Sequence, residues 1–269
     1  MGRFTAACQS RFVASVLPLL SARLRASLAD PEDLMARILG DLLVAGLGLV
    51  FLWAVFSPVP DIRGWTRAEA LLVWGLAETA SGLSQACFHG LWTQNQRYVL
   101  TGDLDRLLLR PVDPLRGLLA EQCMPGHLAL SVGGLAMVVV AAVDLPPLPL
   151  VVWMGLAVAV VGGAALQGGL MLLVAAVGLR VPHRGRTVGI ASQAAAFARY
   201  PLEVFPAWLS TVLLTVVPMG LVAAVPGAAA LGRLPALALF APVVGGTVLV
   251  LVGAAVWRRA LRGYASSGT

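Results

Sequence analysis

The sequence predicts an all-α integral membrane protein with six transmembrane helices. Its 269 residues are 59% hydrophobic and only 12% charged, and their mean hydropathy of +0.87 lies far above that of soluble domains. Long apolar stretches recur along the chain, and each can cross a hydrocarbon core of about 30 Å. Besides six spans we expect an N-terminal interfacial helix, a short cytoplasmic helix, and broken re-entrant helices before the sixth span.

The N-terminal part, residues 1–36, is predicted to lie along the membrane surface. Its apolar run 12–20 is too short to span and contains Pro18. A cleavable signal peptide is the competing interpretation, but arginines follow the run and there is no convincing small-residue cleavage site. We therefore divide the chain into an N-terminal interfacial helix, a six-span domain over 37–262 and a cytoplasmic tail over 263–269.

The six spans follow from runs of apolar residues between polar or proline-rich connections. They are predicted at about 38–56, 68–92, 118–143, 151–179, 187–208 and 237–257. Residues 209–235 are mostly apolar but contain Pro218 and Pro226, so we expect broken helices that re-enter the outer leaflet. Non-helical backbone at membrane depth is tolerated only where it packs against protein or lines a water-filled cavity. We therefore expect this region to be buried in protein or to line such a cavity.

The arginines predict the orientation, because the chain contains no lysine. Fifteen arginines fall on one side of the predicted membrane, three fall on the other, and Arg199 lies in the fifth span. The positive-inside rule makes the arginine-rich side cytoplasmic. Both termini are then cytoplasmic, and so is the loop between the second and third spans.

That cytoplasmic loop contains a short amphipathic segment, residues 101–111. Asp103 can cap its first turn, and Pro111 marks its end. Leu104, Leu107 and Leu108 fall on one face. Because such a helix is connected to a span at each end, it can transmit a movement of a soluble partner to the membrane helices. An ordinary connector lying at the lipid surface is the alternative interpretation.

Several polar and small residues lie within the predicted spans. Glu78 is near the middle of the second span with Gln85 close by, and an ionisable group there is costly unless it faces protein or water. Glu78 either takes part in a translocation pathway or holds helices together. Arg199 and Glu203 are four residues apart and are expected to pair locally. Glycines recur every seven residues in the fourth and sixth spans, which predicts close helix packing; they are Gly155, Gly162, Gly169, Gly246 and Gly253.

No catalytic or metal-binding pattern stands out. The phosphate-binding loop of ATPases needs a lysine, which the chain lacks. His89, His127 and His183 have no metal-ligand spacing, and Cys87 and Cys123 are expected to be buried thiols. Basic and aromatic residues do not cluster as nucleic-acid binding requires. We expect no enzyme, no metal, no nucleic acid and no cofactor bound by the chain itself.

The segment from Gly102 to Pro111 resembles the G-x-L-D-x-x-L-x-R-P motif of ABC-2 type permeases, specifically the six-span family of type V exporter-like proteins. Ser81-Gly82 and Gln85 precede it in the second span. The later segments Arg199-Tyr200-Pro201-Leu202 and Phe205-Pro206-Ala207-Trp208-Leu209 resemble the fifth span and the region before the sixth in that family. The resemblance covers essentially the whole chain, in order and spacing.

The resemblance implies the permease subunit of an ATP-binding-cassette exporter, with residues 101–111 as the cytoplasmic coupling helix. A separate ABC ATP-binding subunit would bind ATP and Mg²⁺, and a second permease copy or a related permease would complete a homo- or heterodimer. The implied coupling residues are Gly102, Asp103, Leu104, Asp105, Arg106, Leu108, Arg110 and Pro111. The loop 180–186 would be a second, weaker contact. The candidate residues of the translocation pathway are Glu78, Gln85, Tyr200 and Phe205.

On this interpretation the protein exports a hydrophobic or amphiphilic substrate across the cytoplasmic membrane of a bacterium, embedded in membrane lipid. Two other classes stay open. An ion-coupled secondary transporter would use Glu78, although we detect no internal repeat. A membrane-embedded lipid-modifying enzyme would need polar residues that converge at one depth.

Overall fold

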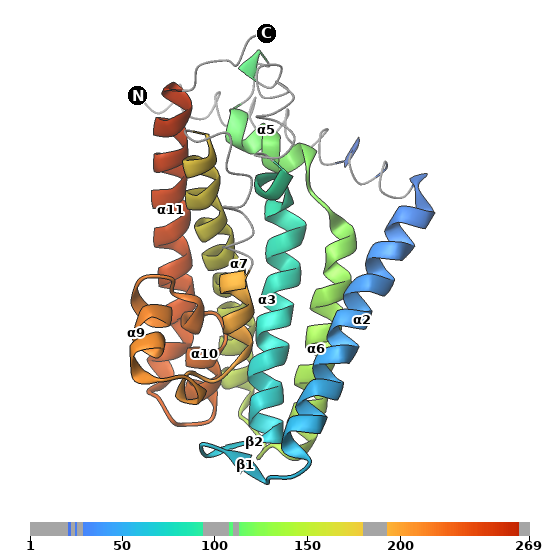
Figure 1. Ribbon diagram of the computed structural model, residues 1–269, viewed down its shortest axis with the longest axis vertical. Coiled ribbons are helices and arrows are strands. Elements are labelled where there is room, and N and C mark those ends of the chain that lie inside the picture. Colours follow the sequence, from blue (N-terminus) through green and yellow to red (C-terminus); the bar gives the residue numbers. More distant parts are fainter. Residues whose placement is uncertain are drawn as a thin grey trace.

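The computed structural model describes residues 21–22, 25, 29–93, 108–109, 113–179 and 193–263. Long helices dominate this part of the chain and form an elongated bundle (Figure 1). These helices are α2 (Pro31–Phe56), α3 (Arg67–Thr93), α6 (Leu128–Asp144), α7 (Leu150–Gly178) and α11 (Ala241–Arg262). The short helix α5 (Pro114–Glu121) lies at one end of the bundle, and the hairpin of β1 (Asp61–Ile62) and β2 (Trp65–Thr66) lies at the other.

Aspartate followed by proline starts two of the helices. The Asp30 side chain accepts a hydrogen bond from the Asp33 amide at 3.3 Å, and Pro31 occupies the first turn of α2. Asp113 caps α5 in the same way, through the Arg116 amide at 3.1 Å. An aspartate at the cap satisfies an otherwise unpaired amide, and a proline in the first turn loses no helical hydrogen bond.

Helix α3 lies at the centre of the bundle, between α6 and α7 (Figure 1). Nearly every residue from Ala70 to Ala86 is buried or half-buried. Within the described part, four helical segments are long and apolar enough to cross a membrane, and a bent helix pair makes a fifth candidate; α3 is not among them. Its polar side chains are compatible with a membrane because they face protein rather than lipid.

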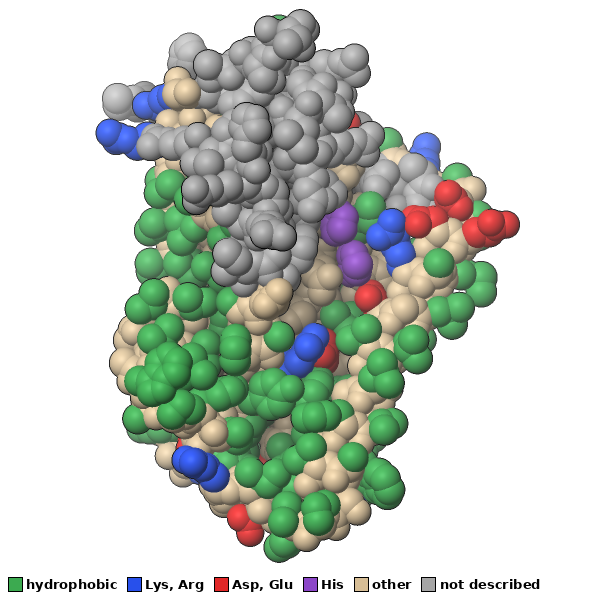
Figure 2. All heavy atoms as spheres, viewed as in Figure 1, with side chains coloured by type: hydrophobic (Ala, Val, Ile, Leu, Met, Phe, Trp, Pro, Cys, Tyr) green, Lys and Arg blue, Asp and Glu red, His purple; other side chains and the backbone are tan. Residues whose placement is uncertain are grey.

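The outer faces of the other long helices carry large exposed apolar side chains. Leu43 and Trp53 on α2, Val143 on α6, Leu150 on α7 and Leu251 on α11 are all more than half exposed. On the face drawn in Figure 2, apolar side chains are spread along the length of the described surface, and charged side chains are few. A surface this apolar requires a lipid environment. The protein is therefore a multi-pass, all-α membrane protein.

Several predicted boundaries are wrong in detail. The helix that contains the first predicted span begins at Pro31, so residues 31–36 are continuous with it in α2. The third predicted span, 118–143, joins two helices: α5 ends at Glu121, and α6 starts after the 3₁₀ turn η2 (Pro125–His127). Pro125 causes this break, because it cannot donate a helical hydrogen bond. The rest of residues 1–36 lies largely outside the described residues.

The fifth predicted span, 187–208, is not a continuous helix at its C-terminal end. Within its described part, residues 193–208, the helix passes into the 3₁₀ turn η3 (Phe197–Arg199), and another turn, η4 (Leu202–Val204), follows Pro201. Trp208 instead lies in a new helix, α9 (Ala207–Thr215), which starts after Pro206. A residue before proline is disfavoured in helical geometry, which explains both breaks.

Residues 207–230 are broken, as the prolines predict. Helix α9 is followed by η5 (Met219–Leu221) and α10 (Ala224–Ala230), and the two halves are bent by 81°. Pro226 is within the first turn of α10 and therefore does not interrupt it. All of α10 is buried, and a Cβ added at Gly227 would lie 2.8 Å from the Val73 side chain of α3. The 3₁₀ turn η6 (Ala236–Phe240) then leads into α11.

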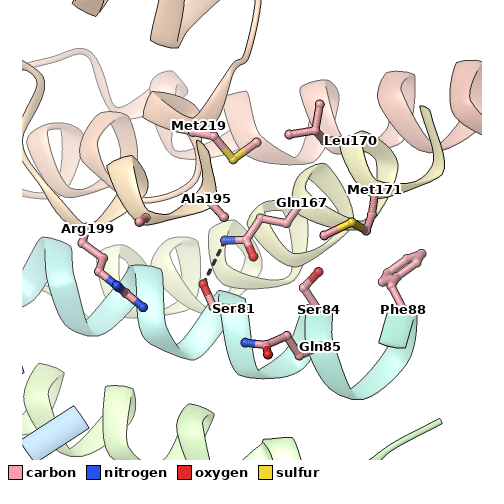
Figure 3. A pocket seen from close by; sticks show the side chains of 11 residues that line it. Ser81, Ser84, Gln85, Phe88, Gln167, Leu170, Met171, Ala195, Arg199 and Met219 are labelled. Carbon is pink, nitrogen blue, oxygen red and sulfur yellow. Dashed lines mark hydrogen bonds between the residues drawn. The ribbon is translucent and has the colours of Figure 1, made fainter. Parts of the chain in front are cut away.

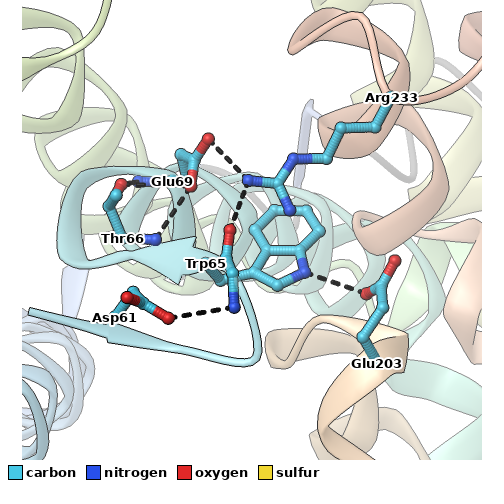
Figure 4. A network of polar contacts seen from close by, with 7 residues as sticks. Asp61, Trp65, Thr66, Glu69, Glu203 and Arg233 are labelled. Atoms are coloured by element: carbon cyan, nitrogen blue, oxygen red, sulfur yellow. Dashed lines mark hydrogen bonds and ion pairs between the residues drawn. The ribbon is translucent and has the colours of Figure 1, made fainter.

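Trp65 organises the hairpin end of the bundle (Figure 4). Its indole Nε1 donates to Glu203 Oε2 at 3.0 Å, and the Arg233 guanidinium lies 4.2 Å from the centre of its ring. Arg233 also donates to the Gly64 carbonyl and to Glu69 Oε1, both at 2.7 Å. These contacts join the β1–β2 hairpin to α3, η4 and the loop after α10.

Glycines bring α7 and α11 into backbone contact, as their seven-residue spacing predicts. A Cβ added at Gly246 would overlap the Gly162 carbonyl oxygen, and one at Gly253 would lie 3.0 Å from the Gly169 carbonyl oxygen. At Gly155 the added atom would come within 2.8 Å of Leu239. Small residues on facing stripes let two helices approach this closely, so packing accounts for the repeat.

We predict that Gly162→Ala destabilises the bundle. The new Cβ would lie 2.7 Å from the Pro242 carbonyl carbon and would overlap the Val243 amide, and backbone cannot move aside as a flexible side chain can. Overpacking of this kind costs about 1–3 kcal/mol. The measurement is the melting temperature of the purified protein. Gly40→Ala on α2 is the control, because its Cβ would meet no atom within 4 Å. Equal melting temperatures for the two variants would contradict the assigned α7–α11 contact.

Candidate functional site

A polar cavity of about 220 Å³ lies beside α3, near the middle of the bundle (Figure 3). Ser81, Ser84, Gln85 and Phe88 line it from one face of α3, because they follow the i, i+3, i+4, i+7 spacing of a helix. The rest of the wall is formed by Gln167, Leu170 and Met171 of α7, together with Ala195, Ala196, Arg199 and Met219. Gln167 Nε2 donates to Ser81 Oγ at 3.1 Å, which joins α3 to α7 across the cavity.

An ion pair between Glu78 and Arg199 lies at the edge of this cavity. Arg199 Nε is 2.6 Å from Glu78 Oε1, and Trp74 Nε1 donates to the same oxygen at 3.0 Å. The Glu78 side chain is 0% exposed, and its second oxygen, Oε2, has no hydrogen-bond partner. The Arg199 side chain is 29% exposed. The pair joins α3 to η3 and compensates a buried carboxylate that would otherwise be very costly.

A second cavity, of about 140 Å³, is also lined by Arg199 and is apolar. Phe51, Leu52, Val55 and Phe56 of α2 line it, with Ile62, Trp65, Ala70, Tyr200, Pro201 and Val204. An aromatic cluster extends from it: the Tyr200 ring lies 5.3 Å from Trp74 and 6.1 Å from Phe205, measured between ring centres. Arg199 lines both cavities and, among the residues that the structure describes, is the one charged side chain in their walls.

The structure brings the predicted pathway residues close to these cavities. Gln85 lines the polar cavity, Tyr200 lines the apolar one, and Phe205 packs against Tyr200. Glu78 lies behind both and contacts them through Arg199. Whether a substrate passes along them stays a prediction.

The predicted pair between Arg199 and Glu203 is wrong. Tyr200 and Pro201 have extended backbone, with ψ of 143° at each, so residues 199 and 203 do not share a helical face. Arg199 instead turns inward to Glu78, and Glu203 accepts from Trp65. Sequence reasoning could have matched Arg199 with Glu78, because both are charged residues at membrane depth, and such residues need partners.

Most of the predicted coupling segment lies outside the described residues. The predicted coupling residues outside the description are Gly102, Asp103, Leu104, Asp105, Arg106, Arg110 and Pro111. The loop 180–186 lies outside it too. Leu108 is described and is exposed. Its position neither tests nor changes the predicted role of the segment.

Two of the three histidines, His89 and His127, come together at the α5 end of the bundle. His127 Nδ1 lies 3.2 Å from Asp41 Oδ2, and the His127 and His89 rings are 5.3 Å apart. These contacts join α2, η2 and α3. Within the described chain, no three His, Cys, Asp or Glu side chains are grouped to hold a metal ion. Cys87 is exposed, so its predicted burial is wrong, and Cys123 is half-buried.

Comparison with known families gives one match that spans most of the chain. The sequence model of a family described as ABC-2 family transporter protein matches residues 42–268. This range includes the motif at 102–111, α3 with its polar face, and the whole proline-broken region. Neither a curated protein nor a solved structure matches the chain.

We predict that Glu78 and Arg199 are energetically coupled. Arg199→Gln leaves a fully buried carboxylate without its cation and should lower stability by about 3 kcal/mol. Replacing both residues by Gln removes both charges, so the double variant should lose much less than the sum of the single losses. The melting temperatures of the parent, both single variants and the double variant provide the test. Additive losses would show that the two side chains act independently.

Proposed function

Because the chain belongs to the ABC-2 family of transporter proteins, we propose that it is the membrane permease subunit of an ATP-binding-cassette exporter. A separate ABC ATP-binding subunit, which holds ATP and Mg²⁺, would supply the energy. The permease would export a hydrophobic or amphiphilic substrate across a bacterial cytoplasmic membrane, as a homodimer or with a related permease. The observation that carries the proposal is the family match over residues 42–268, which includes the G-x-L-D-x-x-L-x-R-P segment.

The packing around α5 supports a path from the coupling segment into the bundle. Helix α5 begins three residues after Pro111, and its Leu115 and Leu118 belong to a buried cluster. That cluster contains Leu91 of α3, Leu172 of α7 and Trp257 of α11. Three long helices therefore meet the element that directly follows the motif. A force applied at residues 101–111 would reach all three through this cluster.

Charge supports docking at the same end. Arg37, Arg116, Arg258, Arg259 and Arg262 lie in the parts of α2, α5 and α11 that form the α5 end of the bundle. Arg63, Arg67 and Arg233 lie at the hairpin end. This distribution supports a cytoplasmic α5 end under the positive-inside rule. The mixed charges of residues 101–111 suit a rim of ion pairs that orients a soluble partner.

We predict that Asp105→Ala/Arg110→Ala weakens capture of the ATP-binding subunit. The tagged parent and the variant are purified from native membranes, and the amount of co-purified subunit and its ATPase activity are measured. Loss of two charged contacts should reduce capture, or uncouple ATPase activity from substrate, while the permease itself stays folded. A hydrogen bond to a charged group typically contributes about 1.5–3 kcal/mol.

The matched control is Arg67→Ala/Asp144→Ala at the opposite end of the bundle. These two side chains are 3.6 Å apart and more than half exposed, so their pair contributes little to stability. The control should retain the ATP-binding subunit at the parent level. A folded parent that purifies without any ATPase, and transports only with a proton or sodium gradient, would replace this proposal with the ion-coupled alternative.

A further inference from the structure

Arg199 lines two cavities of different character, and this position suggests what they bind. The uncharged polar side chains Ser81, Ser84 and Gln85 line one cavity together with apolar residues, and the other cavity, lined by α2, is apolar. An amphiphile has the same two parts, a polar head and an apolar tail. Because Arg199 lines both cavities, it would lie at the junction of the two parts.

The guanidinium of Arg199 has hydrogen-bonding capacity that Glu78 does not use. An arginine carries five N–H donors in a planar guanidinium group and can bind an anion through two of them at once. Glu78 Oε2 accepts nothing, so the pair with Arg199 is not bidentate. Donors therefore remain for a second acceptor on the exposed side of the arginine.

Exposure decides which sign of charge the cavity favours. Glu78 is 0% exposed, whereas Arg199 is 29% exposed. A cationic ligand could reach Glu78 only by displacing Arg199, but an anionic ligand would meet the guanidinium directly. Among the described residues, no other charged side chain lines either cavity, so Arg199 is the charge that an acidic head would meet in this part of the chain.

We infer that the two cavities bind an amphiphile with an acidic head group, and that Arg199 is its counter-ion. The head lies in the polar cavity against Arg199, with Ser81, Ser84 and Gln85 in reach of its other oxygens. The tail lies in the apolar cavity beside α2. Glu78 holds Arg199 in place when the site is empty and competes with the head group for it. This inference rests on the proposed function, because it names the substrate class that the permease would move.

The competition predicts opposite effects for the two charged residues. Glu78→Gln keeps an acceptor for Trp74 but removes the competing negative charge, so binding of an anionic amphiphile should tighten. Arg199→Gln removes the counter-ion, so preference for the anion should disappear. Each effect should be about tenfold in affinity, because a hydrogen bond to a charged group is worth enough to change a dissociation constant by that factor.

The test measures equilibrium binding to the full chain in nanodiscs of zwitterionic lipid. Radiolabelled dodecanoate is the anionic probe, and dodecanol, of the same chain length, is the neutral one; empty nanodiscs give the partitioning background. We expect the parent to prefer dodecanoate, Glu78→Gln to bind it about tenfold more tightly, and Arg199→Gln to bind both probes equally. Arg67→Gln, at an exposed surface pair, should match the parent.

Two results would overturn the inference: unchanged dodecanoate preference in Arg199→Gln, or no tightening in Glu78→Gln. If Arg199→Gln does not fold, the Glu78→Gln/Arg199→Gln variant replaces it, because it leaves no buried charge unpaired. Adding phosphatidylglycerol to the nanodiscs identifies the source of the acidic head group. If phosphatidylglycerol competes with dodecanoate, the site binds a lipid head group. If it does not compete, the site binds a separate single-chain anion. Binding requires no ATPase, so its outcome is independent of whether an ATP-binding subunit is captured.

Discussion

The compensation of Glu78 is the constraint on which the rest of the structure depends. A carboxylate in the middle of a membrane bundle must be removed from lipid and matched by a cation or by hydrogen bonds. The chain meets this requirement by surrounding α3 with α6, α7 and α10, and by bringing Arg199 inward from η3. The extended backbone at Tyr200 and Pro201 makes this contact possible, because an uninterrupted helix would place Arg199 and Glu203 on one face.

Local sequence signals predict where the long helices lie better than they predict the residues at which those helices begin and end. Hydropathy located the long helices, and the glycine spacing in α7 and α11 predicted their close packing, because each signal depends on neighbours within one helix. The division of 118–143 into α5 and α6 was missed, although Pro125 marks it. The predicted span 187–208 extends too far at its C-terminal end for the same reason, since Pro201 and Pro206 break the helix before residue 208.

The candidate site was only partly predictable. Glu78 and Gln85 stood out as polar residues on an apolar helix, and that signal is visible without a structure. The partner of Glu78 was not predicted, because a contact between residues 78 and 199 depends on tertiary packing, whereas a four-residue spacing offered Glu203 as a local alternative. Trp74 and Gln167 gave no signal, since tryptophan and glutamine in an apolar helix are compatible with many environments.

The burial of α3 has a consequence for how the protein is made. Helix α3 enters the membrane with Glu78 uncompensated, because Arg199 is synthesised about 120 residues later. At roughly 5–20 residues per second this delay lasts about 6–24 s. During that interval α3, which is not one of the strongly apolar segments, has to be held by its neighbours or by the insertion machinery. The Glu78–Arg199 ion pair is therefore a late step that locks an already inserted bundle.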